Sequence, residues 1–336
     1  MKNHIGINLG GWLSQSNFHE QYLDTFIIEK DIKTIKEWGA NIIRLPIDYN
    51  IILEDSNKLL FKKDSHRYIN MAISWCNKYD IVCILDFHIS PWHFFLDGVE
   101  GKTYSFFKNN ELIEKHIETL KYIIAPYKDN KRVYLEVLNE PVAENPYDLN
   151  KFYEKIIKEL RKEGINNTLI FESNRWGMVK DFPPLIELLK LDNNIILSFH
   201  LYEPLDFTHQ KAPWIDSYRE TLEYPYEKNG ILYNKKTMKD LFLKEVIKVR
   251  EKYPDIQILC GEFGVYLEAP TESRYKWLKD VVELFDEYSI SWTYWTYKNM
   301  DFGIVNTQYQ YYKLKEYDNI ERIDYRLVDI LFEVEN

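Results

Sequence analysis

The sequence predicts a single (β/α)8 barrel, an α/β fold, and three observations support this fold class. Short runs rich in β-branched and aromatic residues alternate eight times with longer segments of helical periodicity. The length of 336 residues suits one TIM barrel. No Gly-x-Gly-x-x-Gly motif follows the first run, as a doubly wound dinucleotide-binding sheet would require. We therefore expect residues 1–336 to form one domain.

The expected strands share a short length and an apolar character, and they cover residues 5–10, 41–46, 82–88, 133–141, 168–174, 195–204, 256–264 and 290–297. The expected helices cover residues 22–38, 65–79, 110–125, 149–163, 185–189, 237–253, 271–288 and 324–332. In the first helix Leu23, Ile27 and Ile35 recur at helical spacing, and Gly39 ends it. The sixth strand is nearly all apolar, as expected of a strand buried on both faces.

Two connections are long, residues 89–109 after the third strand and residues 205–236 after the sixth. Because both follow a strand, we expect them on the C-terminal face, where barrels place their active sites. They carry many of the 9 Trp, 26 Tyr and 18 Phe of the chain, namely Trp92, Phe94, Phe95, Tyr104, Phe106 and Phe107, and Phe207, Trp214, Tyr218, Tyr224 and Tyr226. We expect these aromatic side chains to gather at the mouth of the barrel.

Composition excludes several classes of protein. The formal charge of −10 would repel a phosphate backbone and an anionic membrane surface, so neither nucleic acid nor membrane is an expected partner. Cys76, Cys83 and Cys260 form no CxxC pair, and we expect reduced, buried thiols. The first residues lack the apolar run of a secretory signal, which predicts a cytoplasmic location unless a leader has been removed, in which case the protein is secreted. The sequence does not indicate the oligomeric state.

Polar residues close several of the apolar strands. They would point at one common site, where burial is costly unless they bond to each other or to a ligand. Together with one tryptophan, these residues are Arg44, Asp86, His88, Asn139, Glu140, His200, Tyr202, Glu262 and Trp295.

Glu140 and Glu262 are the most informative of these residues. They end the fourth and seventh strands, which lie on opposite sides of an eight-stranded ring. Two carboxyl groups facing each other suit glycosidic cleavage, one protonating the leaving oxygen and the other meeting the anomeric carbon. The alternative is a pair of structural, ion-paired glutamates.

At these positions the sequence resembles glycoside hydrolase family 5, a cellulase-like family in the clan of retaining (β/α)8 glycosidases. The resemblance rests on GINLGGW at 6–12, IRLP at 43–46, DFH at 86–88, LNEP at 138–141, HLYEP at 200–204, GEFG at 261–264 and WTYWTYK at 292–298. These motifs occur in order along nearly the whole chain. The resemblance implies an O-glycosyl hydrolase that cleaves β-glucan or β-gluco-oligosaccharides by double displacement without a cofactor or a metal.

The resemblance also implies roles for individual residues. Glu140 is the expected acid/base and Glu262 the expected nucleophile, with carboxyl groups about 5 to 5.5 Å apart. Arg44 and Tyr202 are expected to bond to Glu262 and to keep its pKa low. Glu140 is expected to be protonated before attack.

The remaining expected residues contact the sugar or the acid/base. Asn139 matches a contact to the 2-hydroxyl of the sugar, His88 a contact to another hydroxyl of that sugar, and His200 a neighbour of the acid/base. Trp295 matches the floor on which that sugar stacks. Further sugar platforms are expected at Trp92 and Trp214, with Trp12 as another candidate.

The substrate stays open between several β-linked oligo- or polysaccharides. GGW at 10–12 is similar to members that act on β-1,3-glucan, whereas FTHQ at 207–210 is similar to β-1,4-glucanases. The alternatives are therefore a β-1,4-glucanase-like enzyme, a β-1,3-glucanase, a β-mannanase or a β-glucosidase, acting in endo or exo mode. From other classes, the rivals are an inactive carbohydrate-binding barrel and a metal hydrolase with Asp86, His88 and His200 as ligands, which lacks an HxH or HExxH motif.

Overall fold

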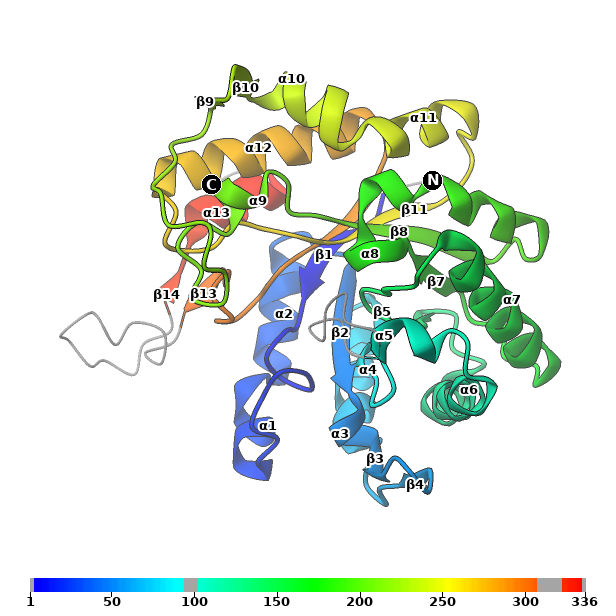
Figure 1. Ribbon diagram of the computed structural model, residues 1–336. Coiled ribbons are helices and arrows are strands. Elements are labelled where there is room, and N and C mark those ends of the chain that lie inside the picture. Colours follow the sequence, from blue (N-terminus) through cyan, green and yellow to red (C-terminus); the bar gives the residue numbers. More distant parts are fainter. Residues whose placement is uncertain (1–2, 94–101, 307–321, 334–336) are drawn as a thin grey trace.

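The computed structural model describes residues 3–93, 102–306 and 322–333. Eight parallel strands close into a barrel in the order β1-β12-β11-β8-β7-β6-β5-β2, with helices around it (Figure 1). The strands are β1 (Ile5–Asn8), β2 (Ile42–Asp48), β5 (Val82–Ile89), β6 (Val133–Glu136), β7 (Leu169–Glu172), β8 (Ile195–Leu201), β11 (Ile258–Phe263) and β12 (Ser291–Tyr294). The predicted fold class is confirmed, and each barrel strand overlaps one of the eight expected runs, with β2 and β5 extending beyond theirs to Asp48 and Ile89.

The helices follow the strands along the chain and cover the outside of the barrel. They are α1 (Glu20–Phe26), α2 (Glu29–Glu37), α3 (Tyr49–Ile52), α4 (Arg67–Lys78), α5 (Lys102–Phe106), α6 (Asn110–Ile124), α7 (Pro146–Lys162), α8 (Asn174–Gly177), α9 (Leu205–Thr208), α10 (Lys235–Thr237), α11 (Lys244–Lys252), α12 (Thr271–Glu287) and α13 (Tyr325–Phe332). Short helices of other types are η2 (Ala125–Tyr127), η3 (Val179–Asp181), η4 (Pro183–Lys190) and η5 (Met238–Phe242). No helix within the described ranges is long and apolar enough to cross a membrane.

Three small antiparallel hairpins or strand pairs stand outside the barrel. They are β3 (Leu53–Asp55) with β4 (Leu60–Phe61), β9 (Tyr226–Lys228) with β10 (Ile231–Tyr233), and β13 (Val305–Asn306) with β14 (Arg322–Ile323). The β9–β10 hairpin lies within the long connection 205–236, so this connection has secondary structure of its own.

Several of the expected elements differ from the observed ones. The helix expected over 185–189 is the 3-10 helix η4, and the one expected over 237–253 is divided among α10, η5 and α11. The helix expected over 22–38 is divided at Ile28, whose extended backbone donates its N–H to Asp31 Oδ2 at 2.8 Å. This bond caps α2 as a separate helix. The fourth strand ends at Glu136 rather than at Pro141, and Glu140 follows it with a left-handed backbone conformation, φ of 46°.

The inside of the barrel changes from apolar to polar along its axis. Side chains of a strand alternate between its two faces, so residues two apart share a face. The lower layer consists of Ile42, Ile84, Ile170, Ile196 and Leu259. Two residues further along four of these strands come Arg44, Asp86, Glu172 and Ser198, all fully buried. The apolar layer closes the barrel from below, and the polar layer lies beneath the site.

Candidate active site

Arg44 on β2 organises the polar layer. Its guanidinium donates to Glu136 Oε2 at 2.6 Å, Glu262 Oε1 at 2.8 Å, Asn139 Oδ1 at 2.8 Å and Asn8 Oδ1 at 3.0 Å. It also lies 3.0 Å from Asp86 Oδ2. Burial opposes the charge on Arg44, but the three carboxylates outweigh it and raise its pKa well above the ordinary value. Arg44 is therefore a fixed cation that holds Glu262 and Asn139 in place.

Glu262 lies in β11, where a register shift between Cys260 and Glu262 interrupts the pairing with β8. Besides Arg44, its carboxylate accepts a hydrogen bond from the Tyr202 hydroxyl at 2.9 Å. Burial raises the pKa of Glu262, and Arg44 and Tyr202 act in the opposite direction. The expected contacts are present, but the expectation of a low net pKa is wrong because burial outweighs them.

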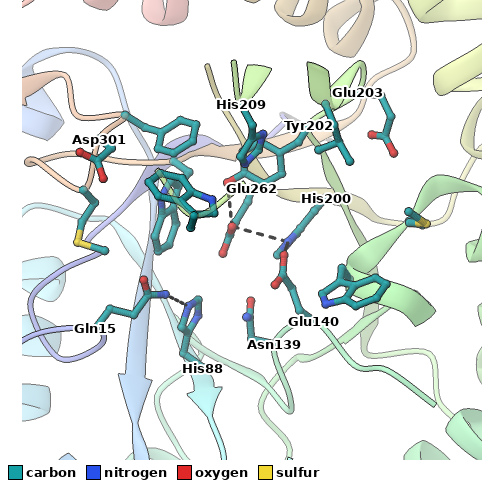
Figure 2. A pocket seen from close by; sticks show the side chains of 17 residues that line it. Gln15, His88, Asn139, Glu140, His200, Tyr202, Glu203, His209, Glu262 and Asp301 are labelled. Carbon is teal, nitrogen blue, oxygen red and sulfur yellow. Dashed lines mark hydrogen bonds and ion pairs between the residues drawn. The ribbon is translucent and has the colours of Figure 1, made fainter. Parts of the chain in front are cut away.

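Glu140 follows β6 and faces Glu262 across the cavity, with His200 beside the pair (Figure 2). His200 Nδ1 lies 3.1 Å from Glu140 Oε1 and 3.7 Å from Glu262 Oε2. Burial raises the pKa of Glu140 well above that of an ordinary glutamate, and the Glu262 carboxylate raises it further. Since the contacts of Arg44 and Tyr202 stabilise a charge on Glu262, a proton shared by the pair resides on Glu140.

The separation of the pair fits one reaction geometry. One oxygen of Glu140, one oxygen of Glu262 and one nitrogen of His200 all lie within 4.8 Å of one another. Retaining glycosidases place their carboxyl groups about 5 to 5.5 Å apart, and inverting enzymes need about 6.5 to 9.5 Å to admit a water molecule. The observed approach agrees with the retaining geometry.

His88 and Trp295 form a stacked pair at the cavity. Their rings are 5.7 Å apart and tilted by only 6°. His88 Nδ1 lies 2.7 Å from Asp86 Oδ2, and its Nε2 lies 2.9 Å from Gln15 Nε2. Burial lowers the pKa of His88 to about 4, so the ring is neutral at pH 7. A neutral ring with Nδ1–H on Asp86 accepts from Gln15 through Nε2.

Gly10 is required by the place of Trp295. A Cβ on Gly10 would lie 2.9 Å from Trp295 Cη2 and 2.9 Å from Thr296 Oγ1. The glycine of the first motif therefore serves close packing against the aromatic floor.

The cavity has a volume of about 550 Å³ and is lined by both Glu140 and Glu262. Arg44 and Asp86 are buried beneath it, and Trp12 and Trp92 also lie outside its lining, whereas the other predicted site residues line this cavity. Its lining is Gln15, His88, Asn139, Glu140, Trp176, Met178, His200, Tyr202, Glu203, Leu205, His209, Trp214, Glu262, Trp295, Met300, Asp301 and Phe302. No lysine or arginine is among these lining residues, which suits an uncharged or cationic substrate better than an anionic one.

Most of the predicted aromatic residues of the two long connections pack elsewhere. Trp214 is 52% exposed and lines the cavity, as expected of a sugar platform. Phe106, Phe107, Phe207, Tyr224 and Tyr226 are buried in the core. Phe94 and Phe95 lie outside the described residues. The gathering of aromatic residues at the mouth is thus smaller than predicted.

Two tryptophans proposed as platforms do not line the cavity. Trp12 is fully buried, stacks on Trp75 and donates to the Leu23 carbonyl, so its assignment as a platform is wrong. Trp92 packs against the core, with its ring edge toward His116 at 6.5 Å.

Sequence reasoning missed Asn8, Gln15, Glu136, Glu172 and Trp176. Glu136 and Glu172 stand in otherwise apolar strands, and Glu172 is two residues beyond the inward-facing Ile170. This spacing of two was the available signal for Glu172. Trp176 carries no such signal, because it reaches the cavity through a left-handed backbone, with φ of 61°.

Two clusters within the described chain hold potential metal ligands, Glu136 with Glu172 and His200, and Glu140 with His200 and Glu262. The first includes Glu136, which Arg44 already neutralises, so a metal cation there would meet a like charge. The suggested set of Asp86, His88 and His200 is not one of the clusters among the described residues. Asp86 Oδ2 is instead engaged by Arg44 and His88.

The barrel and its pair of facing glutamates define a (β/α)8 glycosidase. The family model described as Cellulase (glycosyl hydrolase family 5) matches residues 6–301, and the chain belongs to this family. The protein is therefore an O-glycosyl hydrolase.

Named relatives agree with this assignment. Endoglucanase C of Acetivibrio thermocellus is 36% identical, over 90% of this chain and 93% of its own length. Cellodextrinase A of Ruminococcus flavefaciens is 30% identical, over 85% of this chain and 83% of its own. The structure of Thermotoga maritima Cel5A in complex with mannotriose has a TM-score of 0.76 at 22% identity, covering 98% of this chain and 97% of that one, and supports the fold.

Proposed function

We propose that the protein hydrolyses β-1,4-linked glucan chains or their oligosaccharides with retention of configuration, using Glu140 as acid/base and Glu262 as nucleophile. The observation that carries the proposal is the approach of the two carboxyl groups within 4.8 Å, where Arg44 contacts Glu262 and its described contacts do not include Glu140. The relationship to endoglucanase C and cellodextrinase A supports the choice of substrate.

In the first step Glu262 attacks the anomeric carbon while Glu140 donates its proton to the leaving oxygen. A bond forms between Glu262 and the sugar, the glycosidic bond breaks, and the leaving oxygen departs as a hydroxyl. Arg44 and Tyr202 orient the Glu262 carboxylate for this attack. Trp295 supplies the apolar floor for the sugar ring at the point of cleavage.

In the second step the proton affinity of Glu140 falls. Esterification of Glu262 removes the negative charge that raised the pKa of Glu140. Glu140, now ionised, takes a proton from water, and the resulting hydroxide attacks the anomeric carbon and releases Glu262. Two inversions give net retention.

Asn139 is suited to stabilise the transition state. Its Oδ1 accepts from Arg44, which directs Nδ2 away from that cation, and the residue lines the cavity. We assign Nδ2 as the donor to the 2-hydroxyl of the bound sugar, a contact that strengthens as charge develops.

The test is hydrolysis of a panel of β-1,4-glucan, β-1,3-glucan and mannan oligosaccharides, with the anomer of the first product followed by NMR. We expect release of the β-anomer from cello-oligosaccharides. Glu140→Ala and Glu262→Ala should each reduce turnover by orders of magnitude. Inverted product or full activity in either variant contradicts the mechanism, whereas turnover of mannan or β-1,3-glucan alone contradicts only the substrate. Sugar binding without turnover of any substrate supports the inactive binding protein instead.

A further inference from the structure

Glu172, the last residue of β7, makes two contacts with the acid/base and its neighbour. Its Oε2 accepts the backbone N–H of Glu140 at 3.0 Å. The same oxygen lies 3.4 Å from His200 Nε2, and the opposite nitrogen of that ring lies 3.1 Å from Glu140 Oε1. Glu172 therefore contacts the backbone of Glu140 directly, and His200 lies between Glu172 and the Glu140 carboxyl group.

The contact to the backbone matters because Glu140 has a φ of 46°. A residue with a Cβ adopts this left-handed conformation at a cost, and the surrounding structure must hold it there. The bond from Glu140 N–H to Glu172 is such a restraint, and it fixes the direction in which the Glu140 side chain leaves the backbone.

The surroundings of Glu172 are built closely around it. Gly177 has a φ of 70°, and a Cβ there would lie 2.4 Å from Glu172 Oε1 and 2.8 Å from His200 N. Gly261 lies beside the His200 ring, where an added Cβ would be 3.0 Å from His200 Nε2. Only glycine fits at position 177, an added Cβ at position 261 would press on the His200 ring, and the Glu172 side chain is fully buried.

The charges near Glu172 favour its neutral form. The Arg44 guanidinium contacts Asp86, Glu136 and Glu262 directly, and its described contacts include neither Glu140 nor Glu172. The groups that face Glu172 are Glu136 from β6, Glu140 after β6, His200 from β8, Arg44 from β2, Cys260 from β11 and Tyr153 from α7. Burial raises the pKa of Glu172 well above its ordinary value, and Glu136 and Glu140 raise it further.

We propose that Glu172 is a positioning residue for the acid/base. In its neutral form its carbonyl oxygen accepts the Glu140 N–H and confines the His200 ring against the Glu140 carboxyl. This inference rests on the proposed function, since it assigns Glu140 as the group that protonates the leaving oxygen.

The experiment compares two variants that separate shape from charge. Glu172→Gln keeps the length and an acceptor oxygen, whereas Glu172→Asp keeps the carboxyl and withdraws it by one methylene from both contacts. Glu187→Gln and Glu187→Asp on η4 are matched controls at an exposed glutamate. Each variant is assayed on cellotetraose, whose leaving group needs a proton, and on 2,4-dinitrophenyl β-cellobioside, whose leaving group does not.

We expect Glu172→Asp to reduce kcat/KM for cellotetraose by about tenfold or more, with the dinitrophenyl substrate changed less than about twofold. Glu172→Gln should stay within about twofold of wild type on both substrates. Its pH profile should superimpose on that of wild type. An ionised Glu172 would instead stabilise the protonated form of Glu140, so its removal would shift the alkaline limb to lower pH.

Three results overturn the inference: wild-type activity in Glu172→Asp, an equal loss on both substrates, or a loss or pH shift in Glu172→Gln. If the aspartate variant fails to fold, as melting would show, the pH profile of Glu172→Gln decides. A wild-type enzyme that hydrolyses neither substrate contradicts the proposed function, whereas an active wild type makes the Glu172 variants a test of this inference alone.

Discussion

Replacement of Arg44 by lysine tests whether the guanidinium organises the site. Three nitrogens of Arg44 contact five acceptors, on Glu136, Glu262, Asn139, Asn8 and Asp86. A lysine ammonium has three donors on one nitrogen, so at least two of the five contacts are lost. All of them are buried, and a hydrogen bond to a charged group contributes about 1.5 to 3 kcal/mol. The loss is therefore about 3 to 6 kcal/mol.

This loss translates into a shift in melting temperature. For 336 residues, the entropy of unfolding near 60 °C is about 0.7 kcal/mol/K, so the melting temperature should fall by about 4 to 9 °C. The value of kcat on cellotetraose should fall by about 100-fold or more, because Glu262 loses the bond that orients it.

Calorimetry and steady-state kinetics on Arg44→Lys measure both effects. The control is Arg67→Lys, since Arg67 contacts Glu20 and Asp24 at the surface and should change neither quantity measurably. A melting temperature of Arg44→Lys within about 2 °C of wild type, with kcat within about tenfold, would refute the reasoning.

Four further outcomes are expected. Activity should follow a bell-shaped pH profile, lost on the alkaline side as Glu140 releases its proton and on the acid side as Glu262 is protonated. The acid limb should lie above the ordinary glutamate value of 4.5, because burial raises the pKa of Glu262. An acid limb below that value contradicts the assignment of Glu262 as the nucleophile. Gly10→Ala should push the Trp295 ring aside and raise KM by about tenfold, because an added Cβ would lie 2.9 Å from that ring. The control is Gly164→Ala, where an added Cβ meets nothing within 4 Å and strains only the local backbone, so KM should stay unchanged. Trp214→Ala should weaken binding of longer oligosaccharides by about tenfold with little effect on aryl glycosides, and equal effects on both would place the ring elsewhere. Prolonged treatment with EDTA should leave turnover unchanged, and a loss restored by a divalent cation would revive the metal-dependent rival.

The barrel and the residues that its strand ends bring together could be predicted because both depend on short-range patterns. Each barrel strand is a run of apolar residues long enough to span the barrel, and each following helix has its own apolar stripe. In a closed parallel barrel the strand ends meet at one face, so residues such as Arg44, Glu140 and Glu262, far apart in the chain, are brought together once the strands are counted.

Other features depend on the backbone conformation after the strands, which periodicity does not predict. Glu140 and Trp176 reach the cavity through left-handed backbones that no local preference of glutamate or tryptophan favours. Trp12 and Trp214 have the same side chain, but one packs into the core and the other borders the cavity. The amino-acid composition does not predict which of these two tryptophans is exposed.

The sequence by itself determined the fold class, the strands that carry the site and the two glutamates, because strand periodicity and barrel closure leave few arrangements for those residues. Only the tertiary structure decided how the buried charges share their protons. Three carboxylates contact one guanidinium, while Glu140 and Glu172 lie near His200, and distances of 2.6 to 3.4 Å between these side chains determine where each charge lies. The role proposed for Glu172 follows from those distances.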